Sequence, residues 1–239
     1  MNLLLFVLFL ISFNVFAKDE NISVTPLTDN VYLHTSYLSL PKWGNVPASG
    51  LVVIKGNDAY IVDTPWTNEQ TKALLRWISS QNLVVKGAVV THFHEDASGG
   101  LKTLNNSRIP TYAHSKTNHL LHENNKELAS QNIPTDLFEL VSKMIEVYYP
   151  GKGHSSDNVV VWLPKDKVLF GGCFVKSLNS KSLGNLSDAS VESWPNSIAN
   201  LKKQYPKINI VVPGHGKLGT TALLDHTEEL AKTKLSEQK

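Results

Sequence analysis

The sequence predicts an α/β domain with four αββα layers, in which two mixed sheets pack face to face and helices cover the outside. Two observations lead to this fold class. A pattern of two short strands, a helix and a third strand occurs twice, and each time the last strand leads to a histidine. The composition agrees, since 41 % of the 239 residues are hydrophobic and 18 % are charged, as in ordinary globular domains.

Each copy of the pattern begins with a hairpin signal. Gly50–Ile54 and Ala59–Val62 are short β-rich runs on either side of a Gly-Asn-Asp turn. Val159–Leu163 and Val168–Phe170 repeat this arrangement around Pro-Lys-Asp. Alternating apolar runs joined by such turn residues are typical of β-hairpins.

A helix and then a strand are expected after each hairpin. In the first copy Thr67 and Gln70 form a capping box, and in the second we expect Ser190 to cap the helix. Apolar residues recur at helical spacing behind both positions. The strands that follow, Gly87–Val90 and Ile208–Val212, end just before a histidine. The copies therefore indicate an internal duplication, with two unrelated α/β halves as the alternative.

Two further helices are expected, over Ser115–Asn125 and Ala222–Leu235. At the other end of the chain, Leu3–Phe16 is an apolar run shorter than the ~20 residues that span a bilayer. It ends at Ala17, where small residues suit signal-peptide cleavage. We interpret residues 1–17 as a secretory signal peptide, with a membrane anchor as the alternative.

Residues 18–239 then form a single exported domain, which we expect in the periplasm with no stable membrane anchor after cleavage. The formal net charge is +2, which offers no footprint for nucleic acid. The lone cysteine, Cys173, cannot form an internal disulfide. A single thiol in an oxidising compartment is buried, paired with another molecule, or bound to a metal.

The strongest chemical signal is an H-x-H-x-D motif that follows a predicted strand. On a helix His92 and His94 would point ~200° apart, whereas in an extended segment alternate residues share a side. His92, His94 and Asp96 can therefore converge at the strand end. Imidazole and carboxylate groups together suit zinc.

Three more residues of metal-binding types stand in glycine-flanked loops next to strands, namely His154, Cys173 and His215. One catalytic zinc takes three protein ligands and a water, so the donor set fits two metals better than one. A thiolate favours a soft or borderline ion over Mg²⁺ or Ca²⁺. The alternative is that the six candidate ligands are ordinary surface or core side chains. The other histidines that we expect at the surface are His114, His119, His122 and His226.

With these residues, the chain resembles the metallo-β-lactamases of the first subclass, and is similar to the acquired imipenem-hydrolysing enzymes. The resemblance extends from Val24 to Leu230. Related lactonases and nucleases carry a histidine directly after the motif aspartate, whereas this chain has Ala97 at that position. The landmarks that carry it are, in order, Val31–Thr35, Asp63–Trp66, His92–Asp96, Gly153–Trp162, Leu169–Lys176, Leu183–Asn185 and Val212–Gly216.

The resemblance implies the metallo-β-lactamase sandwich fold and two Zn²⁺ ions. One zinc would bind His92, His94 and His154, and the other would bind Asp96, Cys173 and His215. It also implies that Asp63 hydrogen-bonds the loop backbone or orients a ligand.

The implied activity is hydrolysis of the β-lactam amide bond of penicillins, cephalosporins and carbapenems by a metal-bound hydroxide, which gives antibiotic resistance. Lys176 would bind the substrate carboxylate, Asn185 would assist at the lactam carbonyl, and Asp96 would also serve in catalysis. Trp43 would lie near the tip of a mobile loop, Leu40–Ser49, over the substrate.

The partner would be a small β-lactam molecule, and the protein is expected to be a monomer. Two rival functions stay open from the sequence. One is another hydrolase of the same fold, such as a lactonase or thioesterase. The other is a periplasmic zinc-binding protein without catalysis.

Overall fold

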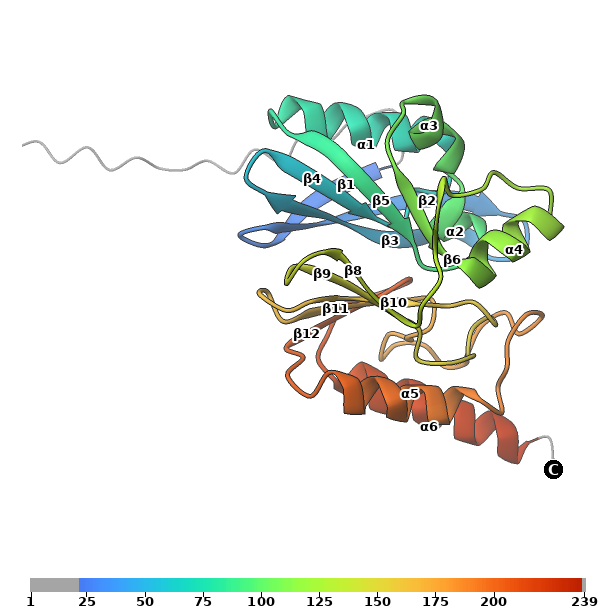
Figure 1. Ribbon diagram of the computed structural model, residues 1–239. Helices are drawn as coiled ribbons and strands as arrows, with labels where there is room; N and C mark the ends of the chain where they lie inside the picture. Colours follow the sequence, from blue (N-terminus) through green and yellow to red (C-terminus); the bar gives the residue numbers. More distant parts are fainter. Residues whose placement is uncertain (1–21, 238–239) are drawn as a thin grey trace, which may run out of the picture.

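The structure is a computed structural model that describes residues 22–237. The signal peptide predicted for residues 1–17 lies outside these described residues. Two sheets stack face to face, and a layer of helices covers the outer side of each sheet (Figure 1). The predicted four-layer α/β sandwich with two mixed sheets is thereby confirmed.

The first sheet has seven strands in the order β1-β2-β3-β4-β5-β6-β7. The pairs from β1 to β4 are antiparallel and those from β4 to β7 are parallel. Its strands are β1 (Ile22–Thr28), β2 (Val31–Leu40), β3 (Gly44–Lys55), β4 (Asp58–Val62), β5 (Val84–Val90), β6 (Thr111–His114) and β7 (Gln131–Ile133).

The second sheet has five strands in the order β12-β11-β10-β9-β8, of which only β11 and β12 pair in parallel. Its strands are β8 (Leu137–Val141), β9 (Ile145–Tyr148), β10 (Val160–Leu163), β11 (Val168–Gly172) and β12 (Ile210–Pro213).

The helices divide between the two outer layers (Figure 1). Those on the side of the first sheet are α1 (Asn68–Ser80), α2 (Glu95–Ser98), α3 (Leu101–Asn106) and α4 (Ser115–Glu123). Those under the second sheet are α5 (Trp194–Gln204) and α6 (Ala222–Ser236). No helix within residues 22–237 has the length and apolar character needed to cross a bilayer.

The repeated unit predicted from the sequence is present in both sheets. The β3–β4 hairpin is followed by α1 and by β5, which pairs in parallel with β4. The β10–β11 hairpin is followed by α5 and by β12, which pairs in parallel with β11. In each sheet, the strand that closes the unit and the strand beside it end at the same edge.

Alternation along the strands divides the core into layers. Leu51 and Val53 of β3 join Phe170 of β11 in the cluster between the two sheets. Val52, between them in sequence, packs in the cluster under α1 instead. Leu169 likewise packs in the cluster formed with α5 and α6. Successive side chains of a strand point to opposite faces, so a sheet covered on both faces is apolar on both.

One predicted helix start is confirmed and the other is wrong. Thr67 Oγ1 accepts a hydrogen bond from the Gln70 N–H (3.2 Å) at the start of α1. Ser190 does not cap α5, which begins at Trp194 after a turn closed by the Ser193 N–H on the Ser190 carbonyl (3.1 Å). Pro195 stands in the first helical turn, where a missing N–H costs no hydrogen bond.

The segment Leu40–Ser49, expected as a mobile loop over the substrate, contains the turn and the first part of the second strand of the β2–β3 hairpin. Leu40 pairs with Gly44 across a tight turn, and Tyr37 pairs with Pro47. Pro47 fits because this end of β3 pairs with β2 alone, and proline is tolerated where the other side of a strand is an open edge.

The packing between the sheets gives a prediction for Phe170→Ala. Phe170 is fully buried between the two sheets, so the truncation should lower the free energy of unfolding by about 3–5 kcal/mol. Urea unfolding followed by tryptophan fluorescence measures this loss. The matched control is Leu137→Ala, at a side chain that is 46 % exposed, and equal losses in the two variants would contradict the assigned core.

Candidate metal centre

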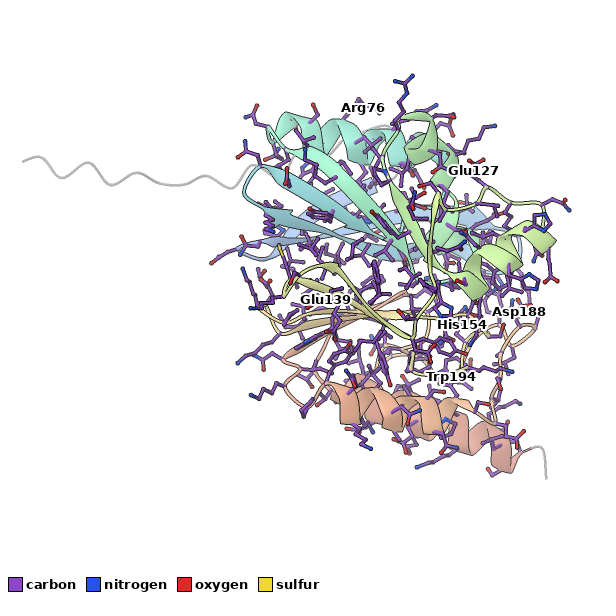
Figure 2. All side chains as sticks on the ribbon, viewed as in Figure 1. Arg76, Glu127, Glu139, His154, Asp188 and Trp194 are labelled. Carbon is purple, nitrogen blue, oxygen red and sulfur yellow. The ribbon has the colours of Figure 1, made fainter. Side chains whose placement is uncertain are left out.

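The residues predicted to bind metal all lie at ends of strands on one edge of the sandwich. His92 and His94 follow β5, and Asp96 lies in the short helix α2 directly after them. Cys173 follows β11 and His215 follows β12. His154 stands in the loop before β10, and Figure 2 shows it near Asp188 and Trp194, away from Glu139 at the other end of the sandwich.

Three of these histidines form one compact group. The ring centroids lie 4.8 Å apart for His92 and His94, and 5.0 Å apart for each of the other two pairs. Each pair is nearly edge to face, and His94 Nδ1 lies 3.0 Å from His154 Nε2. His92 Nε2 is buried with no hydrogen-bond partner. Ring nitrogens gathered in this way are suited to a shared cation, which supplies the missing partner.

Asp96, Cys173 and His215 form a second group beside the first. Cys173 Sγ lies 3.1 Å from Asp96 Oδ2 and 3.3 Å from His215 Nε2, and these two atoms are 2.9 Å apart. The donor atoms of the mixed set His92, His154 and Cys173 also lie within 4.8 Å of one another. The two groups therefore adjoin, as a pair of neighbouring metal ions requires.

The second group contains two acidic side chains whose pKa values are lowered. Burial alone would raise the pKa of Asp96, but the hydrogen bond from His215 and the nearby charge of His92 hold that pKa well below its usual value. Burial also favours the neutral Cys173 thiol, yet His215 and His92 lower its pKa below the usual value. Burial disfavours charge on His215, but Cys173 and Asp96 raise its pKa well above 6.5. Asp96 is thus held as a carboxylate and Cys173 is shifted toward its thiolate form, and a bound metal ion would favour both further.

Two histidines of the first group, His154 and His94, have available lone pairs. Burial, with the charge of Lys176, lowers the pKa of His154 well below its usual value. Burial and the neighbouring His92 lower the pKa of His94. Neutral imidazole is the form that binds metals, so both rings are ready to bind at neutral pH. The donor set fits zinc in both groups, because imidazole, carboxylate and thiolate are its usual ligands.

Three of the histidine rings make a further hydrogen-bond contact through a ring nitrogen. The three partners were not predicted from the sequence. Asp188 Oδ2 lies 2.9 Å from His94 Nε2. The Pro47 carbonyl lies 2.5 Å from His215 Nδ1, and Thr91 Oγ1 lies 3.2 Å from His92 Nδ1. A backbone carbonyl has no sequence signature. Asp188 lies three residues after the Leu183–Asn185 landmark, and this position could have indicated that its carboxylate reaches the site.

Asp63 does contact the motif loop, as the resemblance implied. Its Oδ1 accepts a hydrogen bond from the Thr91 N–H (2.6 Å), and its Oδ2 accepts one from the Thr91 hydroxyl (2.7 Å). Burial raises the pKa of Asp63 to about 7, against the charge of His92 and the hydrogen bonds from Thr91. The backbone carbonyl of Asp63 accepts from His34 Nε2 (3.1 Å).

A cavity of about 560 Å³ opens over the two groups. His94, Asp96, His154 and His215 form part of its wall. The predicted substrate residues line it too, together with Trp66, which sequence reasoning did not single out. These substrate residues are Trp43, Lys176 and Asn185, and Lys181 also lines the cavity.

Lys176 is firmly placed in this wall. Its backbone N–H donates to Thr227 Oγ1 (2.8 Å) on α6, and its Nζ lies 5.4 Å from the centre of the Trp194 ring. Burial lowers its pKa, while Cys173 and Asp96 act in the opposite direction. Asn185 is held by the Ser187 N–H, which donates to Asn185 Oδ1 (3.2 Å). That bond uses the acceptor of the amide and not its donors.

Among the remaining histidines the expectation for His114 is wrong. His114 is buried and stacks on the ring of Tyr149 with centroids 5.1 Å apart. It ends β6, and the apolar face of its ring is covered there although the sequence offers no helical or strand periodicity that would show it. His119 is exposed on α4, as expected.

The sequence model of the metallo-beta-lactamase superfamily matches residues 43–215. A relative from Pseudomonas aeruginosa, "Metallo-beta-lactamase type 2", is 42 % identical over 92 % of this chain and 88 % of its own length. The crystal structure of VMB-1 is 50 % identical, with a TM-score of 0.89 over 90 % of this chain and 99 % of that one.

The structure of the DIM-1 metallo-beta-lactamase exposed to ceftazidime is 48 % identical, with a TM-score of 0.88 over 90 % of this chain and 98 % of that one. A shared sequence pattern, a shared fold and the strand-edge donor groups agree. The chain therefore belongs to the metallo-beta-lactamase superfamily. The resemblance to the first subclass that the sequence landmarks indicated is confirmed.

The buried His34 gives a prediction for stability against pH. Burial lowers its pKa from 6.5 to about 4, so the folded protein resists a proton that the unfolded chain accepts. As the pH falls from 7 to 4, His34 alone should reduce the free energy of unfolding by up to about 3 kcal/mol. Urea unfolding of wild type and His34→Gln across this range isolates the contribution, since glutamine retains an N–H donor without titrating. Parallel pH profiles for the two proteins would contradict it.

Proposed function

We propose that this protein hydrolyses the β-lactam amide bond of penicillins, cephalosporins and carbapenems with zinc, and so makes a bacterium resistant to these antibiotics. The observation that carries this function is the pair of adjoining donor groups, His92 with its two partner histidines and Asp96 with Cys173 and His215. They lie beside a cavity whose wall includes His94, Asp96, His154 and His215. A mononuclear zinc protein would not need both groups.

The residues assigned to zinc follow from this geometry. His92, His94 and His154 would hold one ion, and the second group described above would hold the other. When bound, zinc acts as a Lewis acid and lowers the pKa of a coordinated water from 15.7 to about 7. The other steps depend on the side chains of the protein itself.

Lys176 would fix the substrate by its carboxylate. A lysine ammonium is a compact point charge, and here it is partly withdrawn from solvent beside Trp194. An ion pair is stronger in such a place than on an open surface, because solvent screening is weaker. This contact orients the lactam ring over the donor groups.

Asn185 would donate from its amide to the lactam carbonyl oxygen as negative charge develops there. Removal of one such donor typically costs about 2.7–4 kcal/mol of transition-state stabilisation. Asp96 would take part as a metal-holding carboxylate. Since its pKa is held well below the usual value, it carries no proton at neutral pH, and the leaving nitrogen would take its proton from water.

Trp43 would cover the bound substrate. Its side chain is 57 % exposed and lies in the turn between β2 and β3, yet it lines the cavity. A large apolar surface left in water at the mouth of a binding site favours contact with an apolar part of a ligand. The hairpin would thus exclude water from one side of the lactam.

The compartment and state of assembly belong to the same proposal. We place the mature protein in the periplasm after removal of residues 1–17, where β-lactams meet their targets. It would act there as a monomer on a small substrate, without nucleic acid as a partner.

The test of the function is imipenem hydrolysis followed by absorbance. Activity should be lost after treatment with EDTA and return on addition of zinc, because the donor groups hold no other catalytic element. A homoserine lactone and a glutathione thioester serve as comparison substrates. Faster turnover of either one than of imipenem would favour the alternative of a lactonase or thioesterase.

Lys176→Ala gives a second prediction. Loss of the carboxylate contact should reduce kcat/KM for imipenem by about 10–100-fold, which corresponds to ~1.4–2.7 kcal/mol, with most of the change in KM. Lys181→Ala is the matched control, since Lys181 lines the same cavity but is exposed. Equal effects of the two substitutions would remove the assigned role of Lys176.

A further inference from the structure

The proposed metal centre requires one particular tautomer of His92, and the inference drawn here rests on that proposed function. His92 Nε2 faces the donor groups, 3.5 Å from Asp96 Oδ1, and has no hydrogen-bond partner. To bind a metal, Nε2 must offer its lone pair, so the ring proton must sit on Nδ1. A buried Nδ1–H needs an acceptor, because an unpaired buried donor is costly.

The atom next to Nδ1 is Thr91 Oγ1, at 3.2 Å. A hydroxyl both donates and accepts, so it would serve either tautomer unless its own proton is committed elsewhere. Asp63 makes that commitment. Its Oδ2 lies 2.7 Å from Thr91 Oγ1, while its Oδ1 is already occupied by the Thr91 N–H at 2.6 Å.

Asp63 is itself held in an unusual conformation that aims its carboxylate at Thr91. Its φ is +55°, in the left-handed region that is uncommon for residues other than glycine. Its N–H donates to the Val89 carbonyl (2.8 Å), and its own carbonyl accepts from the buried His34. A conformation of this kind persists only where the surroundings fix it.

The packing behind His34 completes the arrangement. A Cβ on Gly50 would lie 2.2 Å from His34 Nε2 and 2.6 Å from the Val62 carbonyl. Only glycine leaves room there for the imidazole to reach the Asp63 backbone. His34 is fully buried, and burial keeps its pKa low. It is therefore a neutral N–H donor and not a charge.

We propose that Gly50, His34, Asp63 and Thr91 form a support chain that fixes His92 as the Nδ1–H tautomer, with Nε2 free for the metal. Within this chain Asp63 sets the direction of the Thr91 hydroxyl, and the hydroxyl accepts from His92 Nδ1–H. The support chain runs from β2 and β3 through the end of β4 to the end of β5. It therefore acts on His92 alone among the proposed metal ligands. Thr91 and Asp63 are positioning residues, because they act on the metal only through His92.

Asp63→Asn distinguishes this role from ordinary packing. If the asparagine amide NH₂ faces Thr91 Oγ1, the hydroxyl proton turns toward His92 Nδ1 and the ring proton moves to Nε2. If the amide flips, its NH₂ faces the Thr91 N–H instead, donor against donor. The first orientation satisfies both contacts and removes the support without a change in side-chain volume. The second keeps an acceptor for the hydroxyl but places two donors against each other, so the first orientation is favoured. Thr91→Val removes the hydroxyl, and Thr91→Ser keeps it.

The experiment is a metal titration of the apoprotein. Zinc affinity is measured by competition with a chromophoric chelator, and the cobalt(II) form reports the second group through the Cys173 thiolate charge-transfer band. Thr91→Val and Asp63→Asn should weaken binding at the histidine group about 10–100-fold while the Cys173 band titrates as in wild type. Thr91→Ser should stay within about threefold of wild type, since it retains the acceptor.

A second readout observes the tautomer directly. In ¹H–¹⁵N spectra of the zinc-bound protein, the ring N–H of His92 should be protected from exchange in wild type and Thr91→Ser. It should be lost or exchange rapidly in Thr91→Val and Asp63→Asn. This signal does not depend on turnover.

Thr111→Val is the matched control for loss of a buried threonine hydroxyl. Thr111 is fully buried on β6, and its hydroxyl donates to Asn105 Oδ1 (2.8 Å), remote from His92 in the hydrogen-bond network. It should lower stability and leave both metal affinities unchanged. Unaltered zinc binding in Thr91→Val, or equal weakening of both groups in Thr91→Val and Thr111→Val, would overturn the support chain. Absence of zinc at the histidine group in wild type would instead overturn the proposed metal centre.

Discussion

Parallel pairing inside each sheet is the constraint on which the donor groups depend. β5 lies parallel to β4 and β12 lies parallel to β11, so strands that are far apart in sequence end at one edge. The loops that leave those ends need no long reach to meet. This pairing brings Cys173 and His215 together within the second sheet, and the face-to-face packing of the two sheets places His92 beside them.

The segments that line the cavity also hold the metal-facing rings. Pro47 belongs to the hairpin that carries Trp43, and its carbonyl holds His215. Asp188 follows Asn185 in the same loop, and its carboxylate holds His94. A ligand that displaces the hairpin would therefore disturb His215 in one donor group, and a ligand that displaces the Asp188 loop would disturb His94 in the other. Binding and metal geometry are not separable properties in this arrangement.

Much of this could be read from the sequence, since the relevant signals are local. Strand runs that end in His92 or His215 beside glycine gave both the sheet edge and the donor types. What could not be read were contacts between distant segments. The burial of His114 depends on Tyr149, which lies 35 positions away. The strand pairing of Pro47 depends on which side of β3 has a neighbour.

The repeated unit also determines how the donors are shared. One copy supplies His92, His94 and Asp96, and the other supplies Cys173 and His215, so each half contributes to a centre that lies between them. A single unit would expose its polar strand ends to solvent with an incomplete set of ligands. Neither half alone therefore carries the complete second group, since Asp96 comes from one copy and Cys173 and His215 come from the other.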